Sequence, residues 1–274
     1  MTGAGVAGLW RRAVTFDLLI RNATLPDGRM NQDVAVRDGR ITAVEPGIDA
    51  DATEIIEAHG HLLTPPFVDP HFHMDATLSL GQPRMNMSGT LLEGISLWGE
   101  LRPTLTREAV VDRAVRYCDL AVSKGLLAVR SHVDVSDPKL VTVEGLLEVR
   151  DRVAPYLDLQ LVAFPQDGFY RCPDAEKALI RALDMGVDVV GGIPHFERTM
   201  EEGHASVEAL CRIAAERGLR VDMHCDETDD PMSRHVETLA AQTVRFGLHG
   251  RVAGSHLTSM HSMDNYYVSK LLPL

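Results

Sequence analysis

The sequence predicts an α/β protein, a TIM-like parallel (β/α)8 barrel of which only about six strands are present, preceded by a small β-domain. Three observations predict it. Residues 16–65 contain short apolar runs separated by Asp-Gly turns. From residue 66 onward, six apolar segments alternate with helical patterns, as in parallel βαβ units. Polar residues follow each of these segments, at the end of the strands where barrels carry their active sites.

Length and charge narrow the class of function. The chain has 274 residues and a net charge of −12, and an acidic surface disfavours nucleic acid as a partner. A small-molecule substrate is therefore expected. No run of about 20 apolar residues predicts a membrane span. The four cysteines form no Cys-x-x-Cys pair, which favours a cytoplasmic protein over a disulfide scaffold.

The N-terminal part divides into a leader and a small domain. Residues 1–15 are interpreted as a short leader rather than a signal peptide, because Arg11 and Arg12 interrupt the apolar stretch. Residues 16–65 predict a small antiparallel sheet whose turns fall at Asp27-Gly28 and Asp38-Gly39. So small a sheet is too thin to be stable alone.

The barrel is expected over residues 66–274. Its predicted strands lie in PPFVDPHFH, GLLAVRSHVDV, LDLQLVAFPQ, VDVVGGIPHF, LRVDMHCDE and RVAGSHLTS. Helices are predicted at 107–124, 175–185 and 204–217, the last closed by Gly218. The third to sixth strands begin about 31 residues apart, the spacing of a full barrel of typically about 250 residues. Two further units would lie beyond residue 274, so the chain is expected to be truncated at its C-terminus.

Histidines at strand ends predict a metal site. His71 and His73 are two residues apart on a strand, so both side chains point to the same face, where they offer half of a site. A pair of hydrogen-bonded surface histidines is the alternative. His224 ends the fifth strand and Glu227 follows it, placed to carry protons in a hydrolysis. His256 ends the sixth strand.

Other polar residues have plainer interpretations. Asp226 belongs to an acidic run expected to be a solvated loop, and His235 is expected to be exposed. His132 and Asp134 could form a hydrogen-bond network at the barrel mouth. Asp222, inside a strand, is expected to serve a buried hydrogen bond.

Seven segments in order resemble the amidohydrolase superfamily, and within it the bacterial cytosine deaminases and their relatives. They are PPFVDPHFHMD, SGTLLEGISLW, VRSHVDVSD, LVAFPQDG, DVVGGIPHFE, VDMHCDETDD and SHLTSMHS. The resemblance implies a metal-dependent hydrolase barrel with a small β-sandwich domain. It also implies that His71, His73 and His224 bind the metal together with an eighth-strand aspartate, expected beyond Leu274.

The same resemblance assigns the remaining site residues. Glu227 matches the proton-shuttling glutamate and His256 the sixth-strand histidine that orients the attacking water. Gln166 matches the glutamine that holds the pyrimidine amide, with Leu91 and Phe164 lining the pocket. Two-metal members carry a bridging lysine, which the corresponding segments GGIPHFE and AFPQDG lack. One divalent ion, Fe2+ or Zn2+, is therefore implied.

The function expected from these features is hydrolytic deamination of a pyrimidine-like cyclic amidine, cytosine to uracil plus ammonia. Isocytosine, methylcytosine and creatinine present similar edges and remain alternative substrates. Cyclic-amide hydrolysis is a second enzymatic alternative, although the missing lysine counts against it. An inactive fragment that keeps metal or ligand binding is the third alternative, and the full-length protein is expected to be a homo-oligomer.

Overall fold

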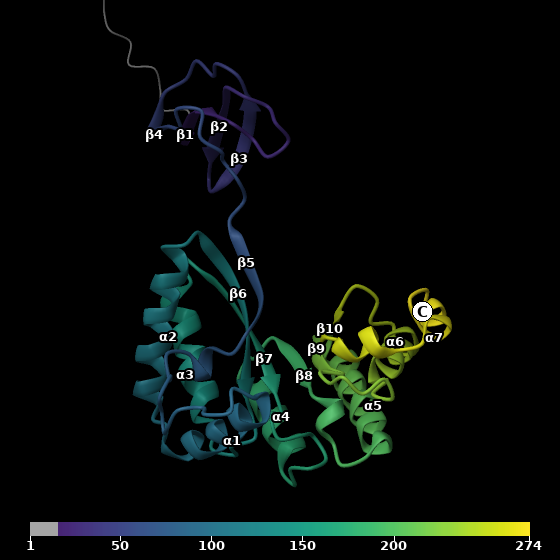
Figure 1. Cartoon of the computed structure of the whole chain (residues 1–274). Coiled ribbons are helices and arrows are strands. Elements are labelled where there is room, and N and C mark those ends of the chain that lie inside the picture. Colours follow the sequence, from purple (N-terminus) through teal and green to yellow (C-terminus); the bar gives the residue numbers. More distant parts are fainter. Residues whose placement is uncertain (1–15) are drawn as a thin grey trace, which may run out of the picture. The chain divides into compact units, whose positions relative to one another are not determined.

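A computed structural model describes residues 16–274, and the predicted leader lies outside the described residues. Contacts divide the chain into two compact units, Met1–Pro65 and Pro66–Leu274 (Figure 1). No helix in the described part of the chain is long and apolar enough to cross a membrane. Each unit is built around its own β-sheet.

The first unit is a four-stranded sheet in the order β3-β2-β1-β4. Its strands are β1 (Phe16–Ala23), β2 (Gln32–Arg37), β3 (Arg40–Glu45) and β4 (Ala52–Glu57). Strands β1, β2 and β3 pair antiparallel as predicted. The prediction is wrong for β4, which pairs parallel with β1, because the chain crosses from one edge of the sheet to the other after β3. The described residues thus form one sheet where the resemblance implies a sandwich.

The second unit contains a six-stranded parallel sheet in the order β10-β9-β8-β7-β6-β5. Its strands are β5 (Phe67–Phe72), β6 (Leu126–Asp134), β7 (Asp158–Phe164), β8 (Val189–Gly192), β9 (Arg220–Cys225) and β10 (Val252–His256). Every strand lies within a segment predicted as a strand. Strands that lie next to each other in the sheet also follow each other in the sequence. This confirms the predicted order of successive βα units.

Helices follow or connect these strands. They are α1 (Leu91–Leu101), α2 (Arg107–Val122), α3 (Val141–Val153), α4 (Ala175–Asp184), α5 (Met200–Arg217), α6 (His235–Arg245) and α7 (Asn265–Leu271), with short 3-10 turns η1 (Met74–Ala76), η2 (Arg102–Thr104), η3 (Pro194–Phe196) and η4 (Thr258–Ser262). Thr199 caps the first turn of α5 through its hydroxyl oxygen. Gly218 ends that helix with a φ of 69°, as its sequence position predicts.

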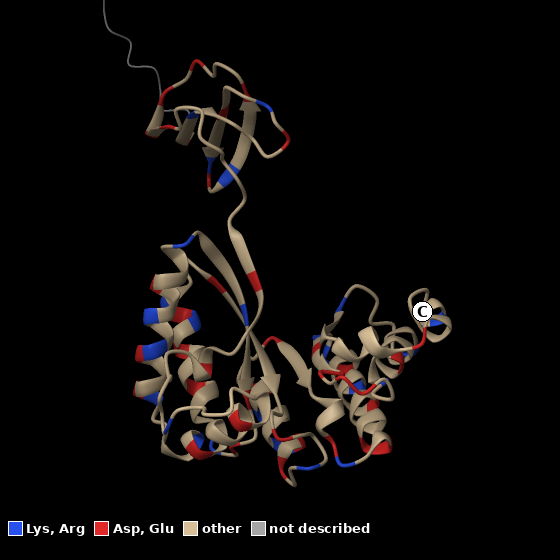
Figure 2. Cartoon of the chain, in the orientation of Figure 1, with Lys and Arg blue, Asp and Glu red and all other residues tan. Residues whose placement is uncertain are grey.

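The two faces of the parallel sheet differ in chemistry because side chains alternate along a strand. The apolar core lies between the outer face and the helices, and includes Leu161 of β7 and Met223 of β9. Figure 2 shows charged residues along α2 and α5, whereas β8 carries none. The inner face carries His132 of β6 and, on β9, Asp222 and His224, all at most 4% exposed. This polar inner face is where the predicted site residues gather.

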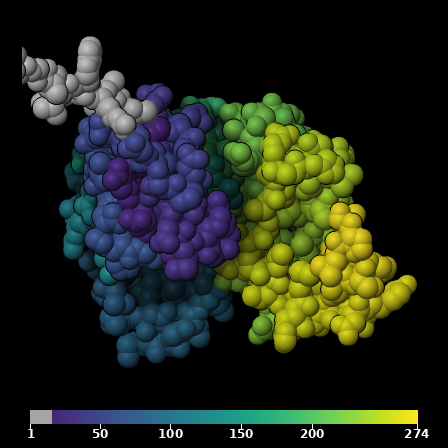
Figure 3. All heavy atoms as spheres, turned by 90° about the horizontal axis from the view of Figure 1, so that it is seen from above, coloured from purple at the N-terminus to yellow at the C-terminus, as the bar shows by residue number. Residues whose placement is uncertain are grey.

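The last residues of the described chain lie on the surface of the second unit. Figure 3 shows α7 and the C-terminus as part of that surface. Tyr266 and Leu272 are 73% and 71% exposed. At the other end of the sheet, Phe67 and Val68 of β5 are 67% and 62% exposed. Strands β5 and β10 each have one neighbour in the sheet of the described chain.

Gly203 permits a close approach between α5 and α6, and we expect Gly203→Ala to destabilise the protein. A methyl group there would collide with the imidazole of His235 and come within 2.6 Å of the Pro194 carbonyl oxygen. Overpacking of this kind costs about 1–3 kcal/mol. Chemical denaturation measures the change in the free energy of unfolding. Gly99→Ala in α1 is the control, since it has open space and should be neutral or stabilising; equal effects would contradict the prediction.

Candidate metal centre

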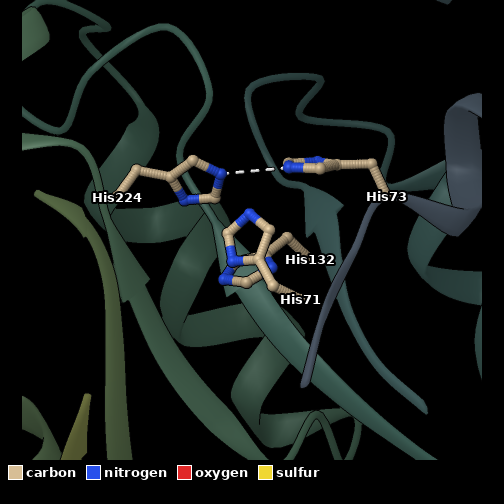
Figure 4. Close-up of side chains that lie close together, drawn as sticks. All are labelled: His71, His73, His132 and His224. Atoms are coloured by element: carbon tan, nitrogen blue, oxygen red, sulfur yellow. Dashed lines mark hydrogen bonds between the residues drawn. The ribbon is translucent and has the colours of Figure 1, made fainter. Parts of the chain in front are cut away.

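Four imidazoles converge on the inner face of the parallel sheet (Figure 4). Each ring offers one nitrogen atom, and these four nitrogens all lie within 4.8 Å of one another. His71 comes from β5, His73 follows that strand directly, and His132 and His224 come from β6 and β9. The predicted ligands His71, His73 and His224 are therefore brought together by strands that are far apart in the sequence.

One pair of ring nitrogens in the cluster is separated by nearly the distance expected for two ligands of one ion. His73 Nε2 lies 3.0 Å from His224 Nε2, and two nitrogen ligands at about 2.0–2.1 Å from a tetrahedral ion lie about 3.3–3.4 Å apart. Among the described residues, the buried Nδ1 of His224 and both ring nitrogens of His132 have no hydrogen-bond partner. Such unpartnered nitrogens in a buried cluster fit a bound cation.

The electrostatics of the cluster keep His71, His73 and His224 neutral. Burial, reinforced by the neighbouring imidazoles, lowers the pKa of His71 to about 4 and that of His73 to about 3. The same causes lower the pKa of His224. Neutral rings carry the free lone pair that a metal ligand needs. The donor set of the cluster therefore fits a divalent transition-metal ion such as Zn2+ or Fe2+.

These pKa values predict that the metal-free protein loses stability in mild acid. Histidines of the unfolded chain titrate near 6.5, so between that pH and about 4 the unfolded state binds more protons than the folded state. The free energy of unfolding should fall as the pH drops through this window. Urea denaturation at pH 7 and pH 5 measures it. In a His71→Gln, His73→Gln double variant, the free energy of unfolding should depend less on pH. An unchanged dependence would show that these two histidines are not its source.

Glu227 and His256 lie beside the cluster. Glu227 Oε2 is 3.7 Å from His256 Nε2, and the His256 ring centroid is 4.6 Å from that of His71 and 5.0 Å from that of His224. His256 has a φ of 72°, which is costly for a residue other than glycine. This backbone turn breaks the alternation of β10 and leaves consecutive residues, Ser255 and His256, both facing the cluster.

A cavity of about 530 Å³ opens over the cluster, and both polar and apolar side chains line it. Gln166, Glu227 and His256 are among its polar lining residues, and Leu91 is among its apolar ones. Phe164 is fully buried and does not line the cavity; its ring stacks on that of His224, with centroids 4.1 Å apart. Phe164 thus packs behind a candidate ligand.

The apolar wall of the cavity is formed in part by α1, which an ion pair fastens to the barrel. Trp98 Nε1 and Arg102 Nη1 both donate to Asp134 Oδ2, at 2.6 and 2.7 Å. Arg102 Nη2 donates to Asp167 Oδ2 at 2.8 Å. Asp134 thus anchors α1. The predicted hydrogen-bond network between His132 and Asp134 does not form, and His132 belongs to the histidine cluster instead.

Glu197 holds the loop that carries Gln166. Its carboxylate accepts hydrogen bonds from the backbone N–H groups of Phe169, Tyr170 and Arg171, which follow Gln166 in the chain. Three backbone donors on one carboxylate fix a loop firmly. The side chain of Gln166 can therefore face the cavity from a defined position.

Two predictions about the loop after β9 are wrong. Asp226 is fully buried rather than solvated, and His235 is 1% exposed. Asp226 Oδ1 accepts hydrogen bonds from the hydroxyl of Ser233 at 2.7 Å and from His235 Nδ1 at 2.8 Å. Although burial favours the neutral acid, these hydrogen bonds lower the pKa of Asp226. The carboxylate ties the loop that carries Glu227 to the start of α6.

His132 is the residue of the cluster that sequence reasoning did not assign as a possible ligand. The signal lay in its position, since it is one of several histidines near the polar end of a predicted strand. Its neighbours Ser131 and Val133 point to the other face by alternation. The alternation could have placed its side chain on the face that carries His224.

Comparison with known proteins agrees with this geometry. The family model described as amidohydrolase family matches residues 54–274, which is most of the chain. The chain belongs to the amidohydrolase family. This amidohydrolase is similar in structure to 5-methylcytosine deaminase from Klebsiella pneumoniae, with a TM-score of 0.89 and 43% identity over 93% of this chain and 63% of that one.

Two curated proteins are also similar to this amidohydrolase. N-isopropylammelide isopropyl amidohydrolase of Pseudomonas sp. strain ADP is 29% identical over 94% of this chain and 65% of its own. Pterin deaminase of Rhizobium rhizogenes is 27% identical over 93% of this chain and 61% of its own. The chain thus spans somewhat less than two thirds of the length of each of these proteins.

Proposed function

We propose that the protein is a metal-dependent hydrolytic deaminase of a pyrimidine-like cyclic amidine, which converts cytosine and water to uracil and ammonia. The observation that carries this proposal is the placing of the histidine cluster, Glu227 and Gln166 around one cavity. The similarity to 5-methylcytosine deaminase and pterin deaminase supports it.

His71, His73 and His224 would hold the metal, as Zn2+ or Fe2+, with His132 beside them. A divalent ion bound there supplies Lewis acidity, which lowers the pKa of water toward 7. The remaining steps rest on the side chains. His71, His73 and His224 line the cavity together with Glu227 and His256. A substrate ring in this cavity would therefore lie next to the water that attacks it.

Glu227 is placed to move protons during the reaction. Its carboxylate takes a proton from the attacking water and delivers it to the ring nitrogen of the amidine. It then carries the second proton of that water to the amino group, which leaves as ammonia while the carbonyl of the product forms. His256, 3.7 Å from the Glu227 carboxylate, orients the water. Both protons of the water are thereby accounted for, one on the ring nitrogen and one in ammonia.

Gln166 selects the carbonyl–NH edge of the ring, and we expect Gln166→Leu to weaken substrate binding. An amide offers one donor and one acceptor side by side, which matches a pyrimidine amide edge. Leucine leaves that edge unpaired in the cavity, at a cost of about 1–3 kcal/mol, or about 10- to 100-fold in kcat/KM. Steady-state kinetics should show most of the loss in KM. An unchanged KM would remove Gln166 from the binding site.

The choice of ring is tested by a substrate panel. Product formation should be measured with the metal-loaded protein, as ammonia release from cytosine, 5-methylcytosine, isocytosine, creatinine and a pterin, and as isopropylamine release from N-isopropylammelide. We expect cytosine or 5-methylcytosine to give the highest kcat/KM. Release of isopropylamine from N-isopropylammelide alone would contradict the proposal, and hydrolysis of a cyclic amide such as dihydrouracil in place of deamination would favour the cyclic-amide alternative.

A further inference from the structure

Asp222 is a buried carboxylate that lies behind the histidine cluster. It is 1% exposed and sits on β9, two residues before His224 and therefore on the same face. Its Oδ2 accepts a hydrogen bond from Arg130 Nη1 at 2.7 Å, and its Oδ1 accepts one from the Ser255 hydroxyl at 2.9 Å. Its Oδ1 also lies 3.6 Å from His132 Nε2. A buried carboxylate with this many partners is held in one place.

Ser255 connects this carboxylate to a candidate metal ligand. Its Oγ lies 3.0 Å from His71 Nδ1. A hydroxyl has one proton to donate, and Asp222, as a carboxylate, can only accept. The serine therefore gives its proton to Asp222 and accepts the N–H of His71 at Nδ1. That arrangement leaves Nε2 of His71 as the nitrogen with a free lone pair.

The contact also joins the two ends of the parallel sheet. His71 lies on β5 and Ser255 on β10, the first and last strands of the sheet order, 184 residues apart in sequence. Arg130 of β6 extends the network to β7, since its Nε donates to Gln160 Oε1 at 2.7 Å. His71 on one edge strand is thus held by a side chain from the opposite edge strand of the sheet.

We propose that Asp222 and Ser255 are positioning residues that act through His71, fixing its Nδ1–H tautomer and turning its Nε2 toward the metal. The proposal rests on the metal site of the proposed function. Metal-bound histidines usually donate their second N–H to a carboxylate, a carbonyl or water, and loss of such a partner costs about 10- to 100-fold in metal affinity. Here a serine hydroxyl relays that role from a buried carboxylate.

The test measures metal affinity in the purified protein without substrate. Zn2+ dissociation constants are obtained by competition with a fluorescent chelator. Ser255→Ala should raise the Kd for Zn2+ by about 10- to 100-fold, while Ser255→Thr, which keeps a hydroxyl, should restore most of the affinity. Ser206→Ala is the matched control, since it removes a buried serine hydroxyl that donates to the Gly203 carbonyl on α5 and should leave the Kd unchanged.

A second variant tests the relay. If Asp222 acts on His71 through Ser255, the Asp222→Asn, Ser255→Ala double variant should lose no more affinity than Asp222→Asn alone. A Ser255→Ala protein that is folded by circular dichroism and binds Zn2+ as tightly as wild type would overturn the proposal, and so would fully additive losses.

A measurement on the wild-type protein covers the case in which the variants do not fold. Nitrogen-15 NMR of the histidine rings in the metal-free protein should show His71 protonated at Nδ1. A ring protonated at Nε2 would overturn the proposal. The Ser255 and Asp222 variants could change Zn2+ affinity as expected while the protein deaminates no substrate in the panel. That result would contradict the proposed function and leave this inference standing.

Discussion

Replacing His224 by alanine is expected to remove the metal and to lower the deaminase turnover by at least about 10³-fold. His224 offers a neutral ring nitrogen 3.0 Å from that of His73 and belongs to the four-histidine cluster. Loss of one of so few ligands leaves an incomplete coordination shell, and removing even an outer-shell partner costs 10- to 100-fold. Metal content per chain, measured by mass spectrometry of the purified protein, and ammonia release report the two effects.

His249→Ala is the matched control for that experiment. His249 is an exposed histidine after α6, outside the cluster, so its removal should change neither metal content nor turnover. A His224→Ala protein that keeps a full equivalent of metal would show that His224 is not a ligand. The cluster would then have to be reassigned to the remaining histidines.

The second large effect is expected at Glu227. Glu227→Gln keeps the size and shape of the side chain but cannot carry a proton, so turnover should fall by at least about 10²-fold, the scale of general acid–base catalysis. Metal content should stay at the wild-type level, because the carboxylate belongs to the proton path and the histidines hold the ion. Steady-state kinetics and metal analysis on the same preparation separate the two roles.

Glu201→Gln on the surface of α5 removes an exposed carboxylate that does not line the cavity and serves as the comparison. Loss of metal from Glu227→Gln would make Glu227 a ligand and end its assignment as the proton carrier. A kcat unchanged from wild type would show that another group moves the proton.

The strands of the barrel and three of its helices, α2, α4 and α5, could be predicted because their signals are local. Apolar runs bounded by turn residues placed β5 to β10, and Gly218 placed the end of α5. The two-residue period of a strand assigned His71 and His73 to one face without any long-range information. Seven motifs that follow one another along the chain then indicated the family, and the family model over residues 54–274 confirmed it.

Burial at the end of β9 could not be predicted in the same way. Asp226 and His235 are polar residues in a polar stretch, and such stretches are usually solvated. They are buried because each satisfies the other, through a 2.8 Å hydrogen bond between Asp226 Oδ1 and His235 Nδ1. Whether a buried polar group is tolerated depends on partners that fold against it, and the composition of the loop does not name those partners.

The sequence by itself determined the order of the βα units and the end of the sheet that carries the polar residues, and its resemblance to the family pointed to His71, His73 and His224 as candidate ligands. Only the tertiary structure decided that His132 joins them, that α1 is fastened by Asp134, and that Ser255 contacts His71 across 184 residues. The physical reason is the range of the interactions. Propensity and alternation act over a few residues, whereas the curvature of a six-stranded sheet sets which inner side chains meet across its face.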